Sequence, residues 1–341
     1  MKVLVATSIY PTTENPAFGS FVRTQVEYLR RAGVGVEVFR LHGRSRKLMY
    51  LEAAFELRRW LSDSSIDLVH AHYSYVGIIA RTQWKVPVVV SYCGDDILGT
   101  MNELGKPTFF SRLAVIAGRI LSNRADAVIV KSHEMASKLK REDVHIIPHE
   151  IDFEVFRPVE KEQARAALGL DPRKKYLLFA ANPKIPVKRF PLARAVADEL
   201  QRQDPSIALP AIYKEPQDRL ALFMSACDAL IFTSYQEGSP NVVKQAMACN
   251  LPIVSTDVGD VRDVIGATKG CYVCKPDVRQ FADCLVDVLR RGVRTQGREK
   301  VKQLSGPAVA QRVIEVYEQV LSKRKGHAVD RAESKPLSAG T

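Results

Sequence analysis

The segment Asp228–Asp260, DALIFTSYQEGSPNVVKQAMACNLPIVSTDVGD, contains a strand–turn–helix–strand pattern. The apolar run Ala229–Thr233 predicts a buried strand, and a polar turn that holds Glu237 follows it. A helix is predicted to begin at Asn241 and to lead into a second strand at Pro252–Ser255. Two strands joined by a helix form a right-handed βαβ unit, so this segment predicts a parallel sheet.

The same alternation of strands and helices continues in both directions. Lys2–Ser8 is a β-branched run typical of a strand buried on both faces. The pattern pauses between residues 153 and 175, where Pro158 and Pro172 flank a short helical stretch. We therefore expect two α/β domains, at residues 1–155 and 156–306, then a helix at 307–325 and a disordered tail at 326–341. Strands are predicted at residues 2–8, 34–41, 68–71, 86–91, 127–130, 144–147, 176–181, 229–233 and 252–255, and helices at 21–32, 75–83, 134–140, 190–203, 216–227, 241–249 and 277–290.

Length, composition and charge narrow the class of protein. The 341 residues suit about two domains, and 46% hydrophobic with 26% charged residues exclude a wholly disordered chain. The 50 Lys and Arg exceed the 38 Asp and Glu, and this net charge of +12 favours an anionic partner such as a nucleotide or a lipid headgroup. No apolar run approaches the roughly 18–20 residues that span a bilayer. The start of the chain resembles a strand more than a signal peptide, and six cysteines without framework spacing favour the reducing cytoplasm.

The turn between Ser234 and Asn241 is the strongest candidate for a binding site. Backbone N–H groups at a helix start, with the helix dipole behind them, favour an anion such as a diphosphate. Ligands of open parallel sheets bind beyond the carboxyl ends of the strands, where this turn lies. Glu237 sits on the turn, and Gln245 follows eight residues later in the helix. On geometry alone, an ordinary strand–helix connection with a solvated Glu237 is an equal alternative.

This segment resembles the nucleotide-sugar site of the family 4 glycosyltransferases, which have the GT-B fold of two facing Rossmann-like domains. The family pattern is Glu-Gly-x-Pro, a second Glu eight residues after the first, and then Ala-Met-Ala-x-Gly-x-Pro. The chain has Glu237-Gly-Ser-Pro240 and Ala246-Met-Ala248, with Gln245 at the second acidic position and Asn250 at the glycine. The resemblance covers most of residues 1–320 and implies an α/β GT-B fold whose C-terminal helix returns to the first domain.

Segments in the first domain match the family less closely. Gly19 lies where the family's first loop approaches the donor diphosphate, and a plain turn is its alternative role. His72 ends a strand and either faces the cleft or is a hydrogen-bonded structural histidine. Asp96 matches the acid of the pattern Thr-x-His-Gly-x-Asp, but Cys93 replaces the sugar-facing His. His149-Glu150 stands where the family has Asn-Gly.

In the second domain, the segment Ala181–Phe190 matches a loop in which the family holds the donor phosphates with an Arg and a Lys. Lys188 matches the Lys, Arg189 replaces the Gly after it, and Lys184 is the candidate substitute for the Arg. A diphosphate leaving group needs such cations, because negative charge builds on it as the glycosidic bond breaks; a solvated basic loop is the alternative. The resemblance implies catalytic roles for Glu237, Lys188, Asp96 and His72, and donor contacts from Gly19, Lys184, Lys188, Glu237, Gly238, Ser239, Asn241, Val242 and Gln245.

The resemblance implies a retaining glycosyltransferase that moves a hexose-type sugar from a nucleotide-diphosphate sugar, linked to UDP or GDP, to a saccharide or lipid-linked acceptor. Its place would be cell-surface polysaccharide or glycolipid synthesis. We expect no required cofactor and no metal, since no Asp-x-Asp pair follows the strands, and no nucleic-acid partner. Cys271 and Cys274 have metal-site spacing, but residues i and i+3 of a strand point to opposite faces. The alternatives are a GT-B sugar-nucleotide epimerase and a non-catalytic member that binds nucleotide.

One basic segment suggests a membrane contact. Arg44–Leu61, RSRKLMYLEAAFELRRWL, combines basic residues with Leu48, Leu51, Phe55 and Trp60. Such a helix either lies on an anionic membrane and presents a lipid-linked acceptor, or packs on the core with a solvated basic face. We expect core packing, with peripheral contact at the inner face of the plasma membrane as the alternative.

Overall fold

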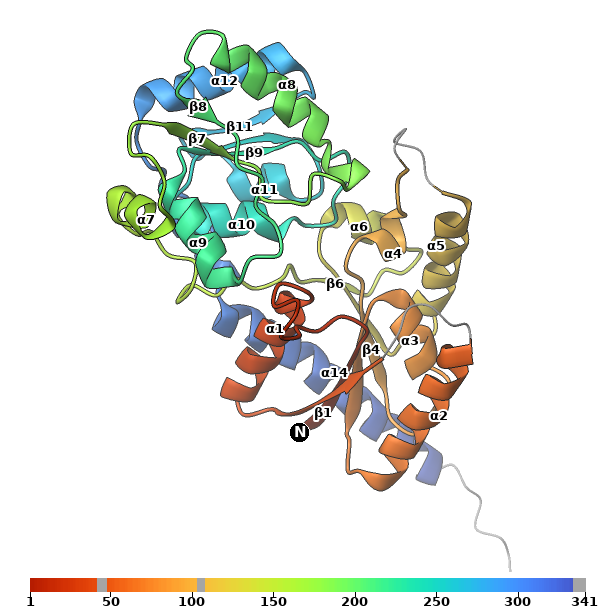
Figure 1. Cartoon of the computed structure of the whole chain (residues 1–341). Helices are drawn as coiled ribbons and strands as arrows, with labels where there is room; N and C mark the ends of the chain where they lie inside the picture. Colours follow the sequence, from red (N-terminus) through yellow and green to blue (C-terminus); the bar gives the residue numbers. More distant parts are fainter. Residues whose placement is uncertain (42–47, 103–107, 334–341) are drawn as a thin grey trace, which may run out of the picture.

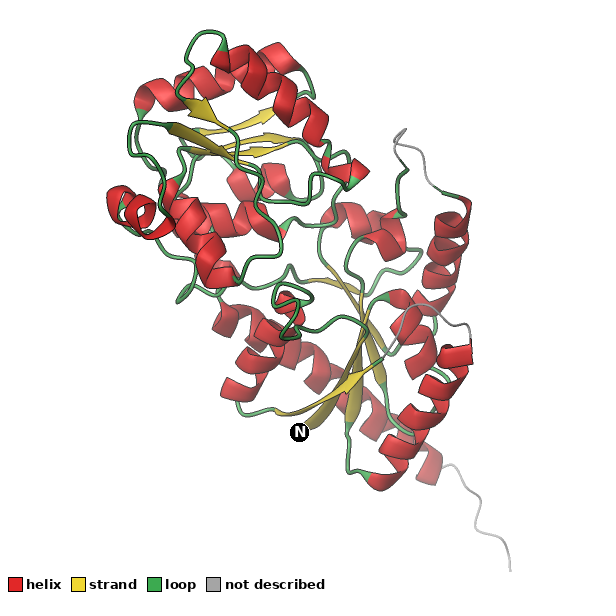
Figure 2. Ribbon diagram, in the orientation of Figure 1, coloured by secondary structure: helices red, strands yellow, loops and turns green. Residues whose placement is uncertain are grey.

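The computed structural model describes residues 1–41, 48–102 and 108–333. Its two sheets are each covered by helices on both faces and form two α/β domains (Figure 1, Figure 2). The strand orders are β2-β1-β3-β4-β5-β6 and β11-β10-β9-β7-β8, and every described strand pair is parallel. The predicted parallel sheets are therefore confirmed. The expected domain boundary at residues 155 and 156 falls between the two sheets and stays a prediction.

The N-terminal sheet separates two apolar cores. Successive side chains of a strand point to opposite faces, so Leu4 and Val69 pack in one core and Val3 and Leu68 in the other. The strands are β1 (Lys2–Thr7), β2 (Gly35–Arg40), β3 (Leu68–His72), β4 (Val88–Ser91), β5 (Ala127–Val130) and β6 (Val144–Ile146). One face carries α2 (Leu48–Asp63), α3 (Ser74–Ala80), α5 (Phe109–Ser122) and α6 (His133–Ser137), with the short α4 (Asp95–Leu98) after β4, and the other carries α1 (Ser20–Arg31) and α14 (Gly306–Glu333).

The C-terminal sheet is built in the same way. Cys271 packs with one core and Cys274 with the other, so the two thiols point to opposite faces as the strand geometry predicts. The strands are β7 (Lys175–Leu178), β8 (Ile207–Ala208), β9 (Ala229–Phe232), β10 (Ile253–Thr256) and β11 (Cys271–Cys274). One face carries α9 (Gln217–Ala226), α10 (Asn241–Ala248) and α11 (Val261–Ile265), and the other carries α8 (Phe190–Gln201) and α12 (Val278–Arg291). Outside these lie α7 (Lys161–Leu168), against α9, and α13 (Gly297–Lys300), against α10.

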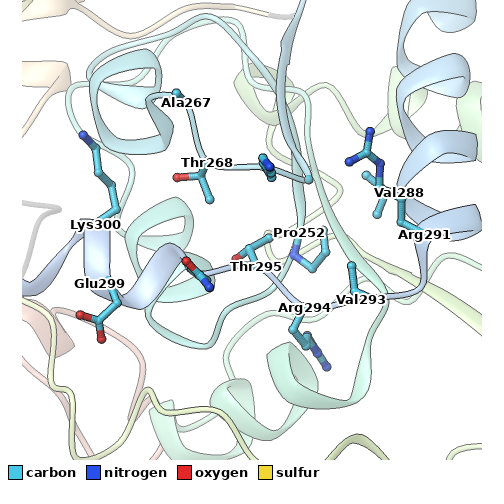
Figure 3. A pocket seen from close by; sticks show the side chains of 13 residues that line it. Pro252, Ala267, Thr268, Val288, Arg291, Val293, Arg294, Thr295, Glu299 and Lys300 are labelled. Carbon is cyan, nitrogen blue, oxygen red and sulfur yellow. The ribbon is translucent and has the colours of Figure 1, made fainter.

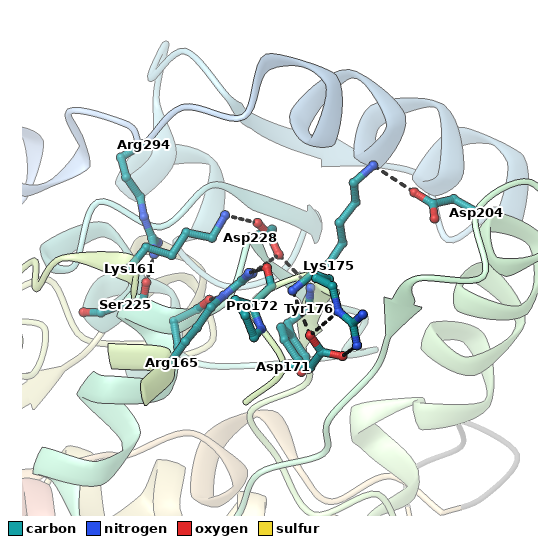
Figure 4. A network of polar contacts seen from close by, with 12 residues as sticks. Lys161, Arg165, Asp171, Pro172, Lys175, Tyr176, Asp204, Ser225, Asp228 and Arg294 are labelled. Carbon is teal, nitrogen blue, oxygen red and sulfur yellow. Dashed lines mark hydrogen bonds and ion pairs between the residues drawn. The ribbon is translucent and has the colours of Figure 1, made fainter. Parts of the chain in front are cut away.

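Asp228, just before β9, fastens the first helix of the C-terminal domain to its sheet (Figure 4). One carboxylate oxygen accepts hydrogen bonds from Arg165 Nη2 at 3.0 Å and from the backbone N–H of Tyr176 at 2.6 Å. The other oxygen pairs with Lys161 of α7. This network holds α7, β7 and β9 together. It lies at the amino ends of the strands, whereas the candidate turn between Ser234 and Asn241 follows the carboxyl end of β9.

The C-terminal helix returns to the N-terminal domain, as predicted. α14 packs beside α1 and contributes Val309, Val313 and Tyr317 to the core beneath the first sheet (Figure 1). The predicted end at residue 325 is wrong, because the helix continues to Glu333. The sequence after Gly326 contains Ala, Arg and Glu, which are strong helix formers, and one glycine costs a helix only about 1 kcal/mol. Of the tail predicted to be disordered, residues 334–341 lie outside the described part of the chain.

His70 of β3 contacts α14, and its burial leads us to expect a loss of stability in acid. Its Nδ1 and Nε2 lie 2.6 Å from the Tyr317 hydroxyl and 2.8 Å from Ser91 Oγ. Burial, followed by the charge of Lys131, lowers the pKa of His70 to about 3. Because this pKa lies below the unfolded value, the stability contributed by neutral His70 is complete above about pH 6.5 and is lost as the pH falls below it, by about 1.4 kcal/mol per pH unit.

His70→Gln removes this titrating group while keeping a hydrogen-bonding side chain. We expect the variant to be less stable than the parent at about pH 7.5, and the difference in unfolding free energy to narrow by about 2 kcal/mol at about pH 5. Urea denaturation at the two pH values measures both quantities. A difference that stays constant over this range would contradict the assignment.

Candidate functional site

Loops at the carboxyl ends of the two sheets meet at the junction between the domains. Gln236, in the turn after β9, donates a hydrogen bond through Nε2 to the carbonyl oxygen of Gly99, which follows α4, at 3.4 Å. A Cβ built on Gly238 would lie 2.8 Å from Met135 Sδ and 3.1 Å from Gly94 Cα. Only a residue without a side chain fits at this distance. The candidate turn therefore faces the loop Cys93-Gly94 of the N-terminal domain directly.

Glu237 and Lys188 meet at this junction. Lys188 Nζ lies 2.5 Å from Glu237 Oε1, and both side chains are largely buried. The loops that carry them are tied together, because the Thr233 hydroxyl lies 2.9 Å from the Lys188 carbonyl oxygen and the Tyr235 N–H donates to the Val187 carbonyl at 2.8 Å. The sequence predicted that these two residues act in one site, and the structure brings them into contact.

Arg189 occupies the position after Lys188 at which the family pattern has glycine. It adopts φ +51°, the left-handed conformation that favours glycine, and it precedes α8. Its guanidinium lies over the Tyr235 ring, 4.1 Å from the centroid, and this cation–π contact offsets part of the backbone strain. Lys184 is exposed and lies earlier in the same loop, where its backbone N–H donates to Asn182 Oδ1 at 3.0 Å.

The helix α10 begins at the candidate turn. Asn241, Val242 and Gln245 are only partly buried, and Asn241 Oδ1 has no hydrogen-bond partner among the described residues. Ser239, by contrast, turns inward: its hydroxyl donates to Asp260 Oδ2 at 2.6 Å and accepts from Lys244 Nζ. Of the donor contacts expected from sequence, Asn241, Val242 and Gln245 on α10 are thus partly buried, and Ser239 is buried and holds the turn in shape.

Asp96 is buried inside the Cys93-Gly94 loop. Its Oδ1 accepts hydrogen bonds from the backbone N–H groups of Cys93 at 3.1 Å and Gly94 at 3.0 Å, and Oδ2 accepts one from Ser74 at 3.0 Å. Burial raises the pKa of Asp96 to about 6, against the effect of these backbone hydrogen bonds. A carboxylate engaged in this way fixes the loop that faces Gly238.

Two family models match the chain. Residues 3–149 match the model of a glycosyl transferase 4-like domain, and residues 189–291 match the model of glycosyl transferases group 1. The chain belongs to the GT-B glycosyltransferases of the family 4 type.

Individual relatives agree with this family. The chain is 29% identical over 280 residues to a D-inositol 3-phosphate glycosyltransferase of Mycobacterium marinum, an alignment that covers 68% of this chain and 57% of that protein. It is 24% identical over 350 residues to TuaC of Bacillus subtilis, a protein named for teichuronic acid biosynthesis, with 84% and 88% covered. The chain thus spans little more than half the length of the Mycobacterium marinum relative.

Solved structures share the fold. Sucrose-phosphate synthase from Thermosynechococcus elongatus superposes with a TM-score of 0.78 at 19% identity, over 95% of this chain and all of that one. Anabaena HepE in complex with UDP-glucose superposes with a TM-score of 0.70 at 17% identity, over 94% of this chain and all of that one. At these identities the likeness establishes the fold alone.

Two of the N-terminal residues that this glycosyltransferase family suggests lie deep in the protein. His72 is fully buried beside His70, with ring centroids 4.6 Å apart, and neither of its ring nitrogens has a hydrogen-bond partner among the described residues. Whether His72 faces the cleft or has a structural role stays a prediction. Gly19 has φ +69°, and a Cβ there would lie 2.6 Å from the backbone of Ile9. Its turn packs tightly on the loop after β1.

Two buried lysines near the junction were not foreseen from the sequence. Lys131, directly after β5, and Lys244 of α10 are each 1% exposed. Lys244 lies 3.3 Å from Asp260 Oδ2, whereas Lys131 Nζ has no hydrogen-bond partner among the described residues. Burial raises the pKa of Glu150, which is influenced by both lysines, to about 7. The only sequence signal was a lysine inside each of two apolar runs, AVIVK and NVVKQAM.

The pocket of about 790 Å³ shown in Figure 3 lies away from this junction. It is lined by Pro252 and Gly270, at the amino ends of β10 and β11, and by Arg294, Thr295 and Lys300. Ligands of open parallel sheets bind at the opposite, carboxyl ends. We therefore place the candidate site at the Glu237–Lys188 pair and not in this pocket.

Proposed function

We propose that the protein is a retaining glycosyltransferase that transfers a hexose-type sugar from a UDP- or GDP-linked donor to a saccharide or lipid-linked acceptor. The observation that carries this proposal is the contact between Lys188 and Glu237 at the domain junction, 2.5 Å apart, beside the partly exposed start of α10. The names of the relatives support the transfer of sugars, and HepE with bound UDP-glucose supports the class of donor.

Lys188 and Glu237 would bind different parts of the donor. The ammonium of Lys188 neutralises the charge that builds on the departing diphosphate, together with Lys184 and the N-terminus of α10. The Glu237 carboxylate accepts hydrogen bonds from the sugar hydroxyls and fixes the ring. In the free protein the two charges stabilise each other, so neither is left buried alone.

We propose substitution from the front face of the sugar. The acceptor oxygen forms the new bond to the anomeric carbon as the bond from that carbon to the diphosphate oxygen breaks. The acceptor's proton passes to the departing phosphate, so no protein nucleophile and no metal is required. The contact of Gly238 with the Cys93-Gly94 loop closes the junction on one side, which limits hydrolysis of the donor by water.

The acceptor would bind on the N-terminal domain. There we assign Asp96 a positioning role, because its three backbone hydrogen bonds shape the loop opposite Gly238. The six cysteines are unpaired, which supports a place in the reducing cytoplasm. None of the described helices is long and apolar enough to cross a membrane.

The proposal is tested by incubating the protein with UDP-glucose, UDP-N-acetylglucosamine, GDP-mannose and ADP-glucose and measuring release of the nucleotide. We expect slow hydrolysis of one donor, because bound donors react with water when no acceptor is present. A non-catalytic nucleotide-binding member is the second candidate, favoured by Gln245 and Cys93 at positions where the family has Glu and His. Binding of a nucleotide without any release would favour that candidate.

Gln245 supplies a further prediction about donor affinity. It lies one turn along α10 from Asn241, and its amide offers one acceptor and one donor to the two ribose hydroxyls. A carboxylate would add charge assistance but also repel the nearby diphosphate. We therefore expect Gln245→Glu to change affinity for the nucleoside diphosphate by less than about tenfold, and Gln245→Ala to weaken it more. Isothermal titration decides, and an alanine variant that binds like the parent would show that Gln245 does not touch the ribose.

A further inference from the structure

Helix α5 carries an exposed apolar stripe. Its large apolar side chains recur every three or four residues and are between 51% and 81% exposed; they are Phe109, Phe110, Leu113, Ile116 and Ile120. The opposite side of α5 packs on α3 and α4, with Leu121 in the core of the N-terminal domain. At 1.5 Å per residue, this 14-residue helix spans about 21 Å. A soluble domain rarely exposes so regular an apolar face unless it binds a partner or a membrane.

A basic groove runs beside this stripe. It has a volume of about 350 Å³ and lies between α4, α5 and the end of α6. Its apolar lining includes Ile97, Leu98 and Val115, and its cations are Arg112, Arg119 and Lys138. All three cations are exposed, and among the described residues no carboxylate lies within ion-pair distance of any of them. The sequence of α5 contains no acidic residue at all.

We propose that α5 docks the protein on an anionic lipid bilayer, with the stripe in the acyl boundary and lipid phosphates against Arg112, Arg119 and Lys138. Apolar side chains on one face of a helix with cations beside them are what an interfacial helix requires. A second copy of the chain fits this surface less well, because a two-fold contact through α5 would bring the arginines of one copy against those of the other.

The docked orientation places the candidate site close to the bilayer. Gly99 lines the basic groove and accepts the hydrogen bond from Gln236 of the C-terminal domain. Gly118 of α5 packs against the segment that follows the Cys93-Gly94 loop, since a Cβ there would be 2.9 Å from the Asp96 carbonyl oxygen. Where the bound lipid is also the sugar acceptor, the inference rests on the proposed function; the docking itself does not.

This surface differs from the membrane contact considered for residues 44–61. Of that segment, residues 42–47 lie outside the described part of the chain. In α2, Leu57 and Leu61 are buried in the core, as expected for core packing, while Leu51 and Phe55 are exposed. Among the α2 side chains that the structure describes, Leu51 and Phe55 are the exposed large apolar ones, whereas α5 exposes five. The groove is lined by Arg112 and Arg119 of α5 and by Lys138 at the end of α6.

Co-sedimentation of the full chain with vesicles tests the proposal without any donor or acceptor. We expect binding to phosphatidylcholine vesicles that contain about 30% phosphatidylglycerol and much weaker binding to phosphatidylcholine alone. Each basic residue near an anionic surface contributes about fivefold to binding, so replacing the three cations of the groove should lower the partition coefficient roughly 100-fold. The charge variant is Arg112→Gln with Arg119→Gln and Lys138→Gln, and its matched control is Lys174→Gln with Lys214→Gln and Lys275→Gln on the C-terminal domain.

The stripe is tested by replacing Phe110, Leu113 and Ile120 with Ser, with Val286→Ser and Val293→Ser as exposed apolar controls on the other domain. We expect the stripe variant to lose binding and to keep the parent's melting temperature and donor hydrolysis.

Equal binding to both vesicle types, or parental binding by the stripe variant, would overturn the proposal. So would loss of binding only in Leu51→Ser with Phe55→Ser on α2, or a dimer without vesicles that the stripe variant dissociates. A chain that binds vesicles but hydrolyses no donor would contradict the proposed function instead.

Discussion

Glu237→Ala and Lys188→Ala are each expected to lower the rate of donor turnover by about 10²-fold or more. One preorganised charge contact at a departing diphosphate contributes roughly 2.7–4 kcal/mol in the transition state. Each variant removes one side of the contact at the domain junction and leaves the other charge largely buried without its partner. Nucleotide release from the donor selected in the screen measures the effect.

The control for this pair is Lys175→Ala. Lys175 pairs with Asp204 at 2.8 Å in the same domain, but away from the junction, and should keep parental turnover. Circular dichroism and thermal unfolding of all three variants separate catalysis from folding. Near-parental turnover by both Glu237→Ala and Lys188→Ala would show that the donor binds elsewhere.

Asp96→Ala is expected to have the largest effect on stability. It removes the acceptor for the backbone N–H groups of Ser74, Cys93 and Gly94, all of which are buried or partly buried. An unsatisfied buried donor costs about 1–3 kcal/mol, so the unfolding free energy should fall by about 3 kcal/mol or more. Urea denaturation measures this change.

The control for Asp96→Ala is the replacement of an exposed carboxylate, whose loss should hardly change the unfolding free energy. Asp283 of α12 is exposed, and its replacement by Ala should change the unfolding free energy by no more than about 0.5 kcal/mol. If Asp96→Ala unfolded at the parent's urea concentration yet lost turnover, Asp96 would act on the substrate directly and not through its loop.

The alternation of strands and helices was predictable because buried parallel strands leave continuous apolar runs in the sequence. The run Ala229–Phe232 and the run Ile253–Thr256 are both fully buried strands of one sheet. Helix α5 was not predicted. Its sequence FFSRLAVIAGRILS has a helical period, but its large apolar side chains lie on the exposed side, whereas Ser111, Gly118 and Ser122 are buried. A rule that turns the apolar face toward the core would therefore orient this helix the wrong way round.

The sequence predicted which residues of the candidate site lie beyond the carboxyl ends of the strands, but not which way their side chains turn. The motif placed Glu237 and Lys188 at the carboxyl ends of neighbouring strands, β9 and β7, and they meet there. Spacing does not say whether a side chain turns toward a ligand or into its own loop. Ser239 and Asp96 both turn inward, and Lys131 ended in the interior although a lysine is ordinarily exposed.

A crystal structure of the full chain with whichever of UDP, GDP and ADP binds in titration would show where the donor binds. We predict the diphosphate within hydrogen-bonding distance of Lys188 Nζ, at the start of α10, with the ribose beside Gln245. Nucleotide bound instead in the pocket between Pro252 and Lys300, with the Lys188–Glu237 contact unchanged, would contradict the account.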